Sequence, residues 1–359
     1  MTLRIDVSRG DSTATIDVLT EIWRRVLQRS SIGPAIDPGD NFFELGGNNL
    51  LVDSLFAEIA QVCGRELPSA TICHAPTIAT LAALLEQPDL PRFPPFFQIK
   101  AGSESPPVVI VPGLGSRPIA TDLAKHICTG HPVYSIQARG ADGMEEPFDR
   151  IEDMAEFYID ALNQLQPHGP YVLIGYSFGG LLALEMAQRL SREGKEVALL
   201  ALMGTYAHPR YFPPGQRLRL IAKRMIRRIS FVARTPIGGT FSNFLLALER
   251  RSRVARALHG RVSSETSRLS FARNLLRVEA SDLVALAHYR PRFYPGKIRF
   301  VTPETDDYYP SDPVPHWKGL AAELEVDTVP GDHVEMVRTH FESVAAVLTR
   351  YVKEAVESK

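Results

Sequence analysis

Cysteine is scarce in this chain, and long apolar runs are missing from it. The 359 residues include three cysteines, Cys63, Cys73 and Cys128, which form no Cys-x-x-Cys pair and show no metal-ligand spacing. This pattern predicts small buried thiols in a reducing compartment and no metal site. The longest apolar runs, such as residues 107–111, have the length of a strand and are too short to cross a membrane.

A net charge of one sign is also missing. Lys and Arg number 40 against 41 Asp and Glu, which gives a net charge of −1 and no general attraction to nucleic acid. The polar residues 1–17 lack the apolar core of a signal peptide. These absences predict a cytoplasmic protein without a nucleic-acid or membrane partner. With 45% hydrophobic and 23% charged residues, the composition is that of a globular protein, and the length suits two compact units.

Residues 12–87 are expected to form a small all-α, carrier-like helical bundle. Apolar residues of the first segment fall on one helical face: Ile16, Leu19, Ile22, Trp23, Val26 and Leu27. Further helices are expected from about residue 48 to 63 and over 78–85. Residues 88–97 are rich in proline and are expected to be a stiff linker.

Residues 98–355 change to alternating strands and helices. Strands are expected at 108–111, 133–137, 171–174, 197–203 and 298–302, with helices at 151–165 and 181–190. This alternation is typical of a parallel sheet with helices on both faces. The stretch of about 206–285 is too long for a simple crossover and is expected to be a helical lid insertion.

A nucleophile elbow is expected at residues 175–179, Gly-Tyr-Ser-Phe-Gly, between an apolar strand and an apolar helix. Ser177 would be the nucleophile of an α/β-hydrolase. One oxyanion donor would be the amide of Phe178, and the other an amide of Gly113 or Leu114 after the first core strand. His333 follows in a loop near the C-terminus, which fits the chain order serine, acid, histidine.

The carboxylate that would complete a catalytic triad with Ser177 and His333 is the least defined residue. The loop after strand 197–203 contains Gly204 and no carboxylate, whereas the loop after strand 298–302 contains Glu304, Asp306 and Asp307. Both loops lie at the carboxyl edge of the sheet. We expect Asp306 to be the acid, with Asp307 and Glu304 as alternatives.

The hydrolase region, about 96–352, resembles the terminal thioesterase of nonribosomal peptide synthetases. The resemblance rests on five segments: residues 134–140, 169–180, 185–187, 289–291 and 330–333. It implies hydrolysis or cyclisation of an acyl or peptidyl chain delivered as a carrier thioester. In that family the acid usually follows the strand that here ends at Met203, where this chain has Gly204.

The N-terminal unit resembles the peptidyl carrier domain of the same family. The matching segments are residues 40–47, 65–68 and 75–79. Carriers hold phosphopantetheine on a serine two residues after Gly-Gly, and Asn49 stands at that position. The resemblance therefore implies a carrier that cannot be primed as written, and a substrate delivered by another module or carrier protein. Ser54, within Asp-Ser-Leu, is a weaker candidate for attachment because it lies about one turn into the helix.

Basic residues dominate the expected lid between Arg217 and Arg256, where Glu249 is the only acid. Three interpretations of this basic segment stay open. It could contact an acidic carrier or a phosphate, form an ordinary solvated helix face, or lie on a membrane surface.

Three functions are compatible with these residues. The first is an acyl-thioester hydrolase or cyclase that works through an acyl-Ser177 intermediate. The second is acyl transfer in trans to an amine, alcohol or thiol. The third is a non-catalytic docking module, suggested by Asn49 and Gly204 together.

Overall fold

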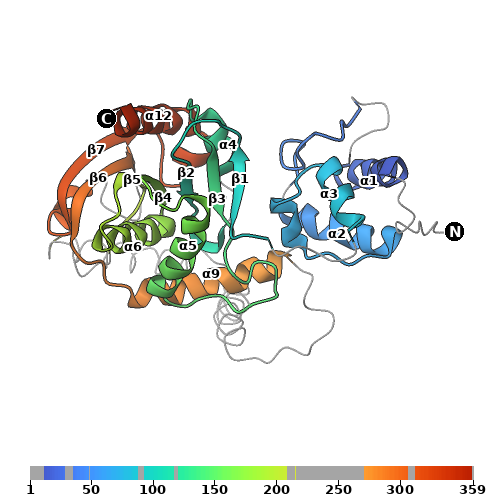
Figure 1. Ribbon diagram of the computed structural model, residues 1–359, viewed down its shortest axis with the longest axis horizontal. Helices are drawn as coiled ribbons and strands as arrows, with labels where there is room; N and C mark the ends of the chain where they lie inside the picture. Colours follow the sequence, from blue (N-terminus) through green and yellow to red (C-terminus); the bar gives the residue numbers. More distant parts are fainter. Residues whose placement is uncertain are drawn as a thin grey trace, which may run out of the picture. The chain divides into compact units, whose positions relative to one another are not determined.

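The computed structural model describes residues 12–28, 35–47, 49–87, 93–116, 120–207, 215, 271–305 and 312–357 (Figure 1). The chain divides into two compact units. The smaller contains the described residues within 1–97, 137–147 and 261–276, and the larger contains those within 98–136, 148–260 and 277–359. In the described part of the chain, no helix is long and apolar enough to span a membrane.

The smaller unit is built on three helices, α1 (Ser12–Val26), α2 (Asn49–Cys63) and α3 (Ile78–Leu85), with a 3₁₀ turn at Ser69–Cys73. The apolar face of α1 is buried because its residues recur at helical spacing. Trp23 and Phe42 are fully buried, and their rings meet edge to face at 5.1 Å between centroids. These contacts give the helical bundle its own core.

The larger unit contains a seven-stranded sheet in the order β1-β3-β2-β4-β5-β6-β7. Its strands are β1 (Phe96–Lys100), β2 (Val108–Val111), β3 (Val133–Ile136), β4 (Tyr171–Tyr176), β5 (Val197–Met203), β6 (Tyr294–Pro303) and β7 (Ala321–Val329). Every neighbouring pair from β3 to β7 is parallel. Strands β2 and β4 are buried along their whole length, as a sheet covered on both faces requires.

Helices cover both faces of this sheet (Figure 1). On one face, α4 (Ala120–His126) and α12 (Phe341–Glu357) pack together and share an apolar core with the strands. On the other, α5 (Ile151–Leu165) packs against α6 (Phe178–Arg192), which contacts the central strands. The remaining described helices are α9 (Phe271–His288), α10 (Val314–Trp317) and α11 (Glu335–Arg338). These layers are those of an α/β-hydrolase.

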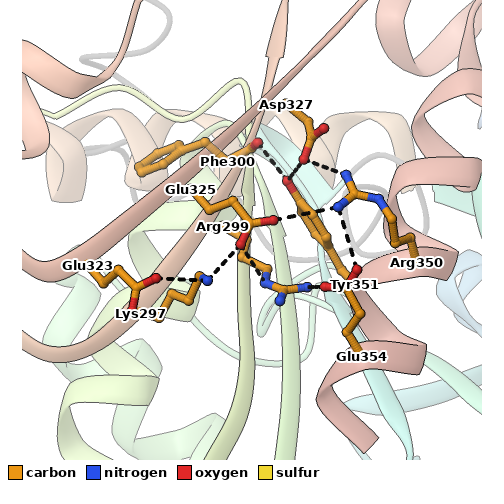
Figure 2. A network of polar contacts seen from close by, with 9 residues as sticks. All are labelled: Lys297, Arg299, Phe300, Glu323, Glu325, Asp327, Arg350, Tyr351 and Glu354. Atoms are coloured by element: carbon orange, nitrogen blue, oxygen red, sulfur yellow. Dashed lines mark hydrogen bonds and ion pairs between the residues drawn. The ribbon is translucent and has the colours of Figure 1, made fainter. Parts of the chain in front are cut away.

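A polar network attaches α12 to strands β6 and β7 (Figure 2). The Tyr351 ring lies between two guanidinium groups, with Cζ of Arg299 at 4.8 Å and Cζ of Arg350 at 5.0 Å from its centroid. Its hydroxyl donates a hydrogen bond to Oδ2 of Asp327 and also lies 3.2 Å from the carbonyl oxygen of Phe300. Aromatic stacking and hydrogen bonding thus hold the last helix against the sheet.

Two edge strands depart from the expectations. β1 begins at Phe96, inside the range expected to be linker, and β7 was not expected at all. Most of the expected lid lies outside the described residues, although α9 provides its helical C-terminal part.

Candidate active site

Ser177 lies at a sharp turn between β4 and α6. Its backbone has φ 55° and ψ −117°, a combination that a residue with a side chain adopts only under strain. Its N–H donates to the carbonyl oxygen of Met203 at 2.8 Å, which ties the turn to the neighbouring strand β5. Ser177 is partly exposed, while the residues on either side of it are buried. The turn therefore presents the serine hydroxyl at the carboxyl edge of the sheet.

The close packing of the turn requires a glycine at position 179 and gives Thr205, in the next loop, a contact with the turn. A Cβ on Gly179 would overlap the carbonyl oxygens of Val111 and Pro112 at the end of β2. The Thr205 hydroxyl donates to the carbonyl oxygen of Ser177 at 3.2 Å. Thr205 thus supports the strained turn from the loop after β5, a contact that sequence reasoning did not identify.

His333 lies in the loop between β7 and α11, and the structure brings it to Ser177. Nε2 of His333 is 3.1 Å from Oγ of Ser177, although 156 residues separate them. This distance allows a hydrogen bond from the serine hydroxyl to the imidazole. The pair has the geometry of a nucleophile and its general base.

Two tyrosine rings flank the imidazole of His333. The Tyr176 ring is stacked on it, with 5.2 Å between centroids and an interplanar angle of 22°, and the Tyr206 ring lies 5.9 Å away. The Tyr176 hydroxyl also donates to the backbone carbonyl of His333 at 2.7 Å. The residue before the nucleophile therefore fixes both the ring and the loop of the histidine.

Gly204 lies directly against the edge of the imidazole that carries Nδ1 and Cε1. A Cβ at this position would be 2.7 Å from Nδ1 of His333, and the backbone φ is +51°. An acid at position 204 would therefore require His333 to move. Which loop supplies the acid stays a prediction.

The loop after β6 runs beside the histidine loop. The N–H of Glu304 donates to Val329 at 2.8 Å, and the N–H of Thr305 donates to Gly331 at 3.2 Å. Glu304 is exposed. Asp306 and Asp307 lie outside the described residues, so the structure does not place the expected acid. Thr305, which precedes Asp306, is bound to Gly331, and Gly331 is two residues before His333.

Asp332 has a local role in the histidine loop. Its Oδ1 accepts the backbone N–H of Val334 at 2.7 Å and that of Glu335 at 2.8 Å. The Glu335 and Val334 N–H groups lower the pKa of the Asp332 carboxyl. This carboxylate is thereby bound to the first turn of α11, where it stabilises the helix N-terminus.

The expected oxyanion donors lie around Ser177. Phe178 is the first residue of α6, and the first N–H groups of a helix have no intrahelical acceptor. The Gly113 backbone is also close to Ser177, because a Cβ on Gly113 would be 3.6 Å from Cβ of Ser177. Leu114 begins a 3₁₀ turn, Leu114–Ser116. Nearby, the N–H of Gly115 is bound to Oδ2 of Asp282 at 2.9 Å, so it is already occupied.

Two further residues of the matching segments meet in the core. The Tyr289 hydroxyl donates to Oε2 of Glu185 at 3.0 Å, and Arg189 binds Oε1 of the same carboxylate at 3.2 Å. Burial raises the pKa of the Tyr289 hydroxyl, and the carboxylate of Glu185 raises it further. This interaction joins α6 to the chain after α9 and is structural, since it lies away from Ser177 along α6.

A parallel sheet with this sharp strand-to-helix turn, and with a histidine loop at its carboxyl edge, is the arrangement of the α/β-hydrolase fold. The chain belongs to the thioesterase domain family, which matches residues 107–351. Residues 17–85 match a second family, described as a phosphopantetheine attachment site. The chain thus contains a carrier domain followed by a thioesterase domain of the nonribosomal peptide synthetase type.

Similar proteins of known sequence are large synthetases. A dimodular nonribosomal peptide synthase of Bacillus subtilis is 30% identical over 328 residues, which is 89% of this chain and 13% of that protein. Indigoidine synthase of Streptomyces lavendulae is 35% identical over 193 residues, 53% of this chain and 15% of that protein. The chain therefore spans only a small part of the length of these relatives.

Solved structures share the fold. A four-domain nonribosomal peptide synthetase bound to AMP and glycine aligns with a TM-score of 0.54 at 18% identity, over 97% of this chain and 26% of that one. The type II thioesterase BorB from the borrelidin biosynthetic cluster aligns with a TM-score of 0.50 at 20% identity, over 74% of this chain and all of that one.

Proposed function

We infer that the chain releases an acyl or peptidyl group from a carrier thioester, by hydrolysis or cyclisation, through an acyl-Ser177 intermediate. The observation that carries this inference is the 3.1 Å approach of His333 Nε2 to Ser177 Oγ at a strained turn. Membership of the thioesterase family supports the thioester as the bond that is attacked.

In the first half of the reaction, Ser177 Oγ attacks the thioester carbonyl carbon while His333 Nε2 takes the hydroxyl proton. The amide of Phe178 and an amide of Gly113 or Leu114 donate to the oxyanion. The C–S bond then breaks, and the leaving thiolate takes the proton from His333.

In the second half, a water or a nucleophile of the acyl chain attacks the ester carbon. His333 takes the proton of this nucleophile and returns it to Ser177 Oγ as the C–O bond breaks. Asp306 is proposed to orient the imidazole and to stabilise its protonated form.

The acyl chain is proposed to arrive from another module or carrier protein. Asn49 is the first residue of α2, and we equate it with the serine that carries phosphopantetheine in the family. An amide has no hydroxyl to be phosphopantetheinylated, so the cofactor does not fit this carrier as written. A second candidate function, transfer of the acyl group in trans to an amine, alcohol or thiol, differs only in the nucleophile that attacks acyl-Ser177.

Labelling with a fluorophosphonate tests the nucleophile without knowledge of the substrate. Ser177 is expected to form a covalent adduct, and Ser177→Ala to abolish it together with hydrolysis of small acyl thioesters. Ser135→Ala is the matched control, because it removes a buried serine hydroxyl that donates to Ile110 in the same sheet. An adduct that persists in Ser177→Ala would reject Ser177 as the nucleophile. No adduct in the unaltered chain would reject the proposal and favour a docking module.

The products then separate the outcomes of the second half-reaction. Hydrolysis gives the free acid of the acyl chain. Cyclisation gives a product one water lighter than this acid, and transfer gives a product whose mass includes the added acceptor. Carrier-bound acyl thioesters are the substrates of choice, with the Ser177→Ala variant as the blank.

A further inference from the structure

A buried carboxyl group holds the loop that follows β2. Oδ2 of Asp282, on α9, accepts the backbone N–H of Gly115 at 2.9 Å, across 167 residues of sequence. Asp282 is 5% exposed. A backbone N–H bound to a carboxylate in a buried position is a strong hydrogen bond, because little water competes for either group.

The loop held in this way lies next to the nucleophile. Gly113 is two residues before Gly115, and its backbone lies against Tyr176 and Ser177. Gly115 has φ 71°, so the direction of the loop changes at the residue whose N–H is bound. A contact at Gly115 therefore constrains the direction of the Gly113 and Leu114 amides.

We propose that Asp282 is a positioning residue for the reaction at Ser177, because its bond to Gly115 holds the Gly113–Leu114 turn where an amide can donate to the oxyanion. This role rests on the proposed function of Ser177. It assigns to α9 a part in catalysis that no motif in the sequence indicates.

The position of the turn matters because oxyanion stabilisation depends on donor geometry. A donor must lie about 2.7–3.1 Å from the oxyanion, and loss of one donor lowers kcat by about 10²–10³-fold. Releasing Gly115 would displace the donor rather than remove it, so a smaller effect is expected.

The carboxyl group at 282 is costly to bury, which argues against an incidental role. Burial raises its pKa to about 7, the Gly115 N–H opposes this shift, and Glu279 on the same helix adds to it. Carboxyl groups held in such unfavourable surroundings are concentrated at functional sites.

Three variants separate the acceptor from the charge. Asp282→Asn keeps an acceptor oxygen and removes the charge, Asp282→Ala removes both, and Asp282→Glu keeps the carboxyl group but moves it by one methylene. Thr349→Val is the matched control, since Thr349 on α12 accepts the backbone N–H of Cys128 at 2.9 Å away from the site. The measurements are the fluorophosphonate reaction rate of Ser177, and kcat and KM on an acyl N-acetylcysteamine thioester.

Asp282→Ala is expected to lower both the labelling rate and kcat by about 10–100-fold, with KM changed less than about threefold. Asp282→Asn is expected to stay within about threefold of the unaltered chain, and Thr349→Val to leave both rates unchanged. If Asp282→Ala does not fold, Asp282→Glu carries the test, with a loss of kcat expected.

A labelling rate in folded Asp282→Ala or Asp282→Glu equal to that of the unaltered chain would overturn the proposal. Equal losses in Asp282→Asn and Asp282→Ala would also overturn it, because the acceptor would then not matter. Failure of the unaltered chain to label at all would reject the function of Ser177 instead, so the two failures are distinguishable.

Discussion

The imidazole of His333 occupies the space beside Gly204, where a Cβ would lie 2.7 Å from Nδ1 and 2.9 Å from Cε1. This contact explains why the residue that follows β5 is a glycine. With this backbone conformation, a Cβ at position 204 would displace His333 from its place beside Ser177.

Gly204→Ala is therefore expected to lower kcat by at least about tenfold, because His333 must move away from Ser177. It is also expected to lower the free energy of unfolding by about 1–2 kcal/mol, since φ is positive at this position. Gly194→Ala is the control: Gly194 has φ +74° and no atom within 4 Å of an added Cβ. The control should lose stability and keep its kcat; equal kcat values in the two variants would contradict the interpretation.

The acid can be found by neutralising each carboxyl group of the loop after β6. Asp306→Asn is expected to lower kcat by at least about 100-fold, because the amide favours the wrong tautomer of His333. Asp307→Asn and Glu304→Gln are expected to change kcat less than about threefold. A large loss in either of these, without one in Asp306→Asn, would move the assignment to that residue.

The carrier domain is expected to be folded but not primed. The unaltered chain, incubated with coenzyme A and a broad-specificity phosphopantetheinyl transferase, should show no gain in mass. Asn49→Ser should gain one phosphopantetheine arm, because it supplies the missing hydroxyl at the start of α2. Since Asn and Ser both serve well at a helix N-terminus, the exchange should leave stability nearly unchanged.

The control for this experiment is Ser54→Ala, since Ser54 is exposed on α2. Modification of the unaltered chain that disappears in Ser54→Ala would show that Ser54 is the attachment site and that the alignment of the motif is shifted.

The network around Tyr351 predicts a dependence of stability on pH (Figure 2). Burial acts to raise the pKa of Asp327, but the hydrogen bonds from Tyr351 and Arg350 outweigh it and lower this pKa. A carboxyl group whose pKa is lower in the folded state stabilises the fold above its unfolded pKa, and this contribution is lost as the pH falls through the folded value.

Asp327→Asn is accordingly expected to lower Tm by about 2–6 °C at pH 7, with the difference vanishing in strong acid. Glu323→Gln is the control, because Glu323 forms an exposed ion pair with Lys297 and should change Tm by less than about 2 °C. Thermal unfolding followed by circular dichroism from pH 7 to pH 2 measures both. A Tm difference for Asp327→Asn that does not shrink in acid would contradict the role of its charge.

The central strands and the elbow could be predicted from the sequence because their signals are local. Strands β2, β4 and β5 are apolar runs buried in the sheet, and the glycines of the turn mark a close approach of backbones. β7 was missed because this edge strand is buried only at its ends, so that Glu323, Glu325 and Asp327 interrupt its apolar pattern. β1 was missed because prolines precede it directly.

The contacts that complete the site could not be predicted, because they join distant parts of the chain. Asp282 reads as a polar residue of an amphipathic helix, and only the fold brings it to Gly115. Tyr176 belongs to the elbow motif, but its bond to the His333 carbonyl depends on the course of a loop 157 residues away. The close approach of His333 to Gly204 likewise arises from packing.

The attachment of α12 has a consequence for the lifetime of the active state. The His333 loop runs from β7 to α11, and α11 packs on α12. The position of His333 therefore depends on a helix that is held by its apolar face and by the contacts of Arg299, Arg350 and Tyr351. A local opening that detaches α12 would free the histidine while β2, β4 and β5 remain paired. Heat should therefore inactivate the protein by fraying of its C-terminal helix, before the sheet itself melts.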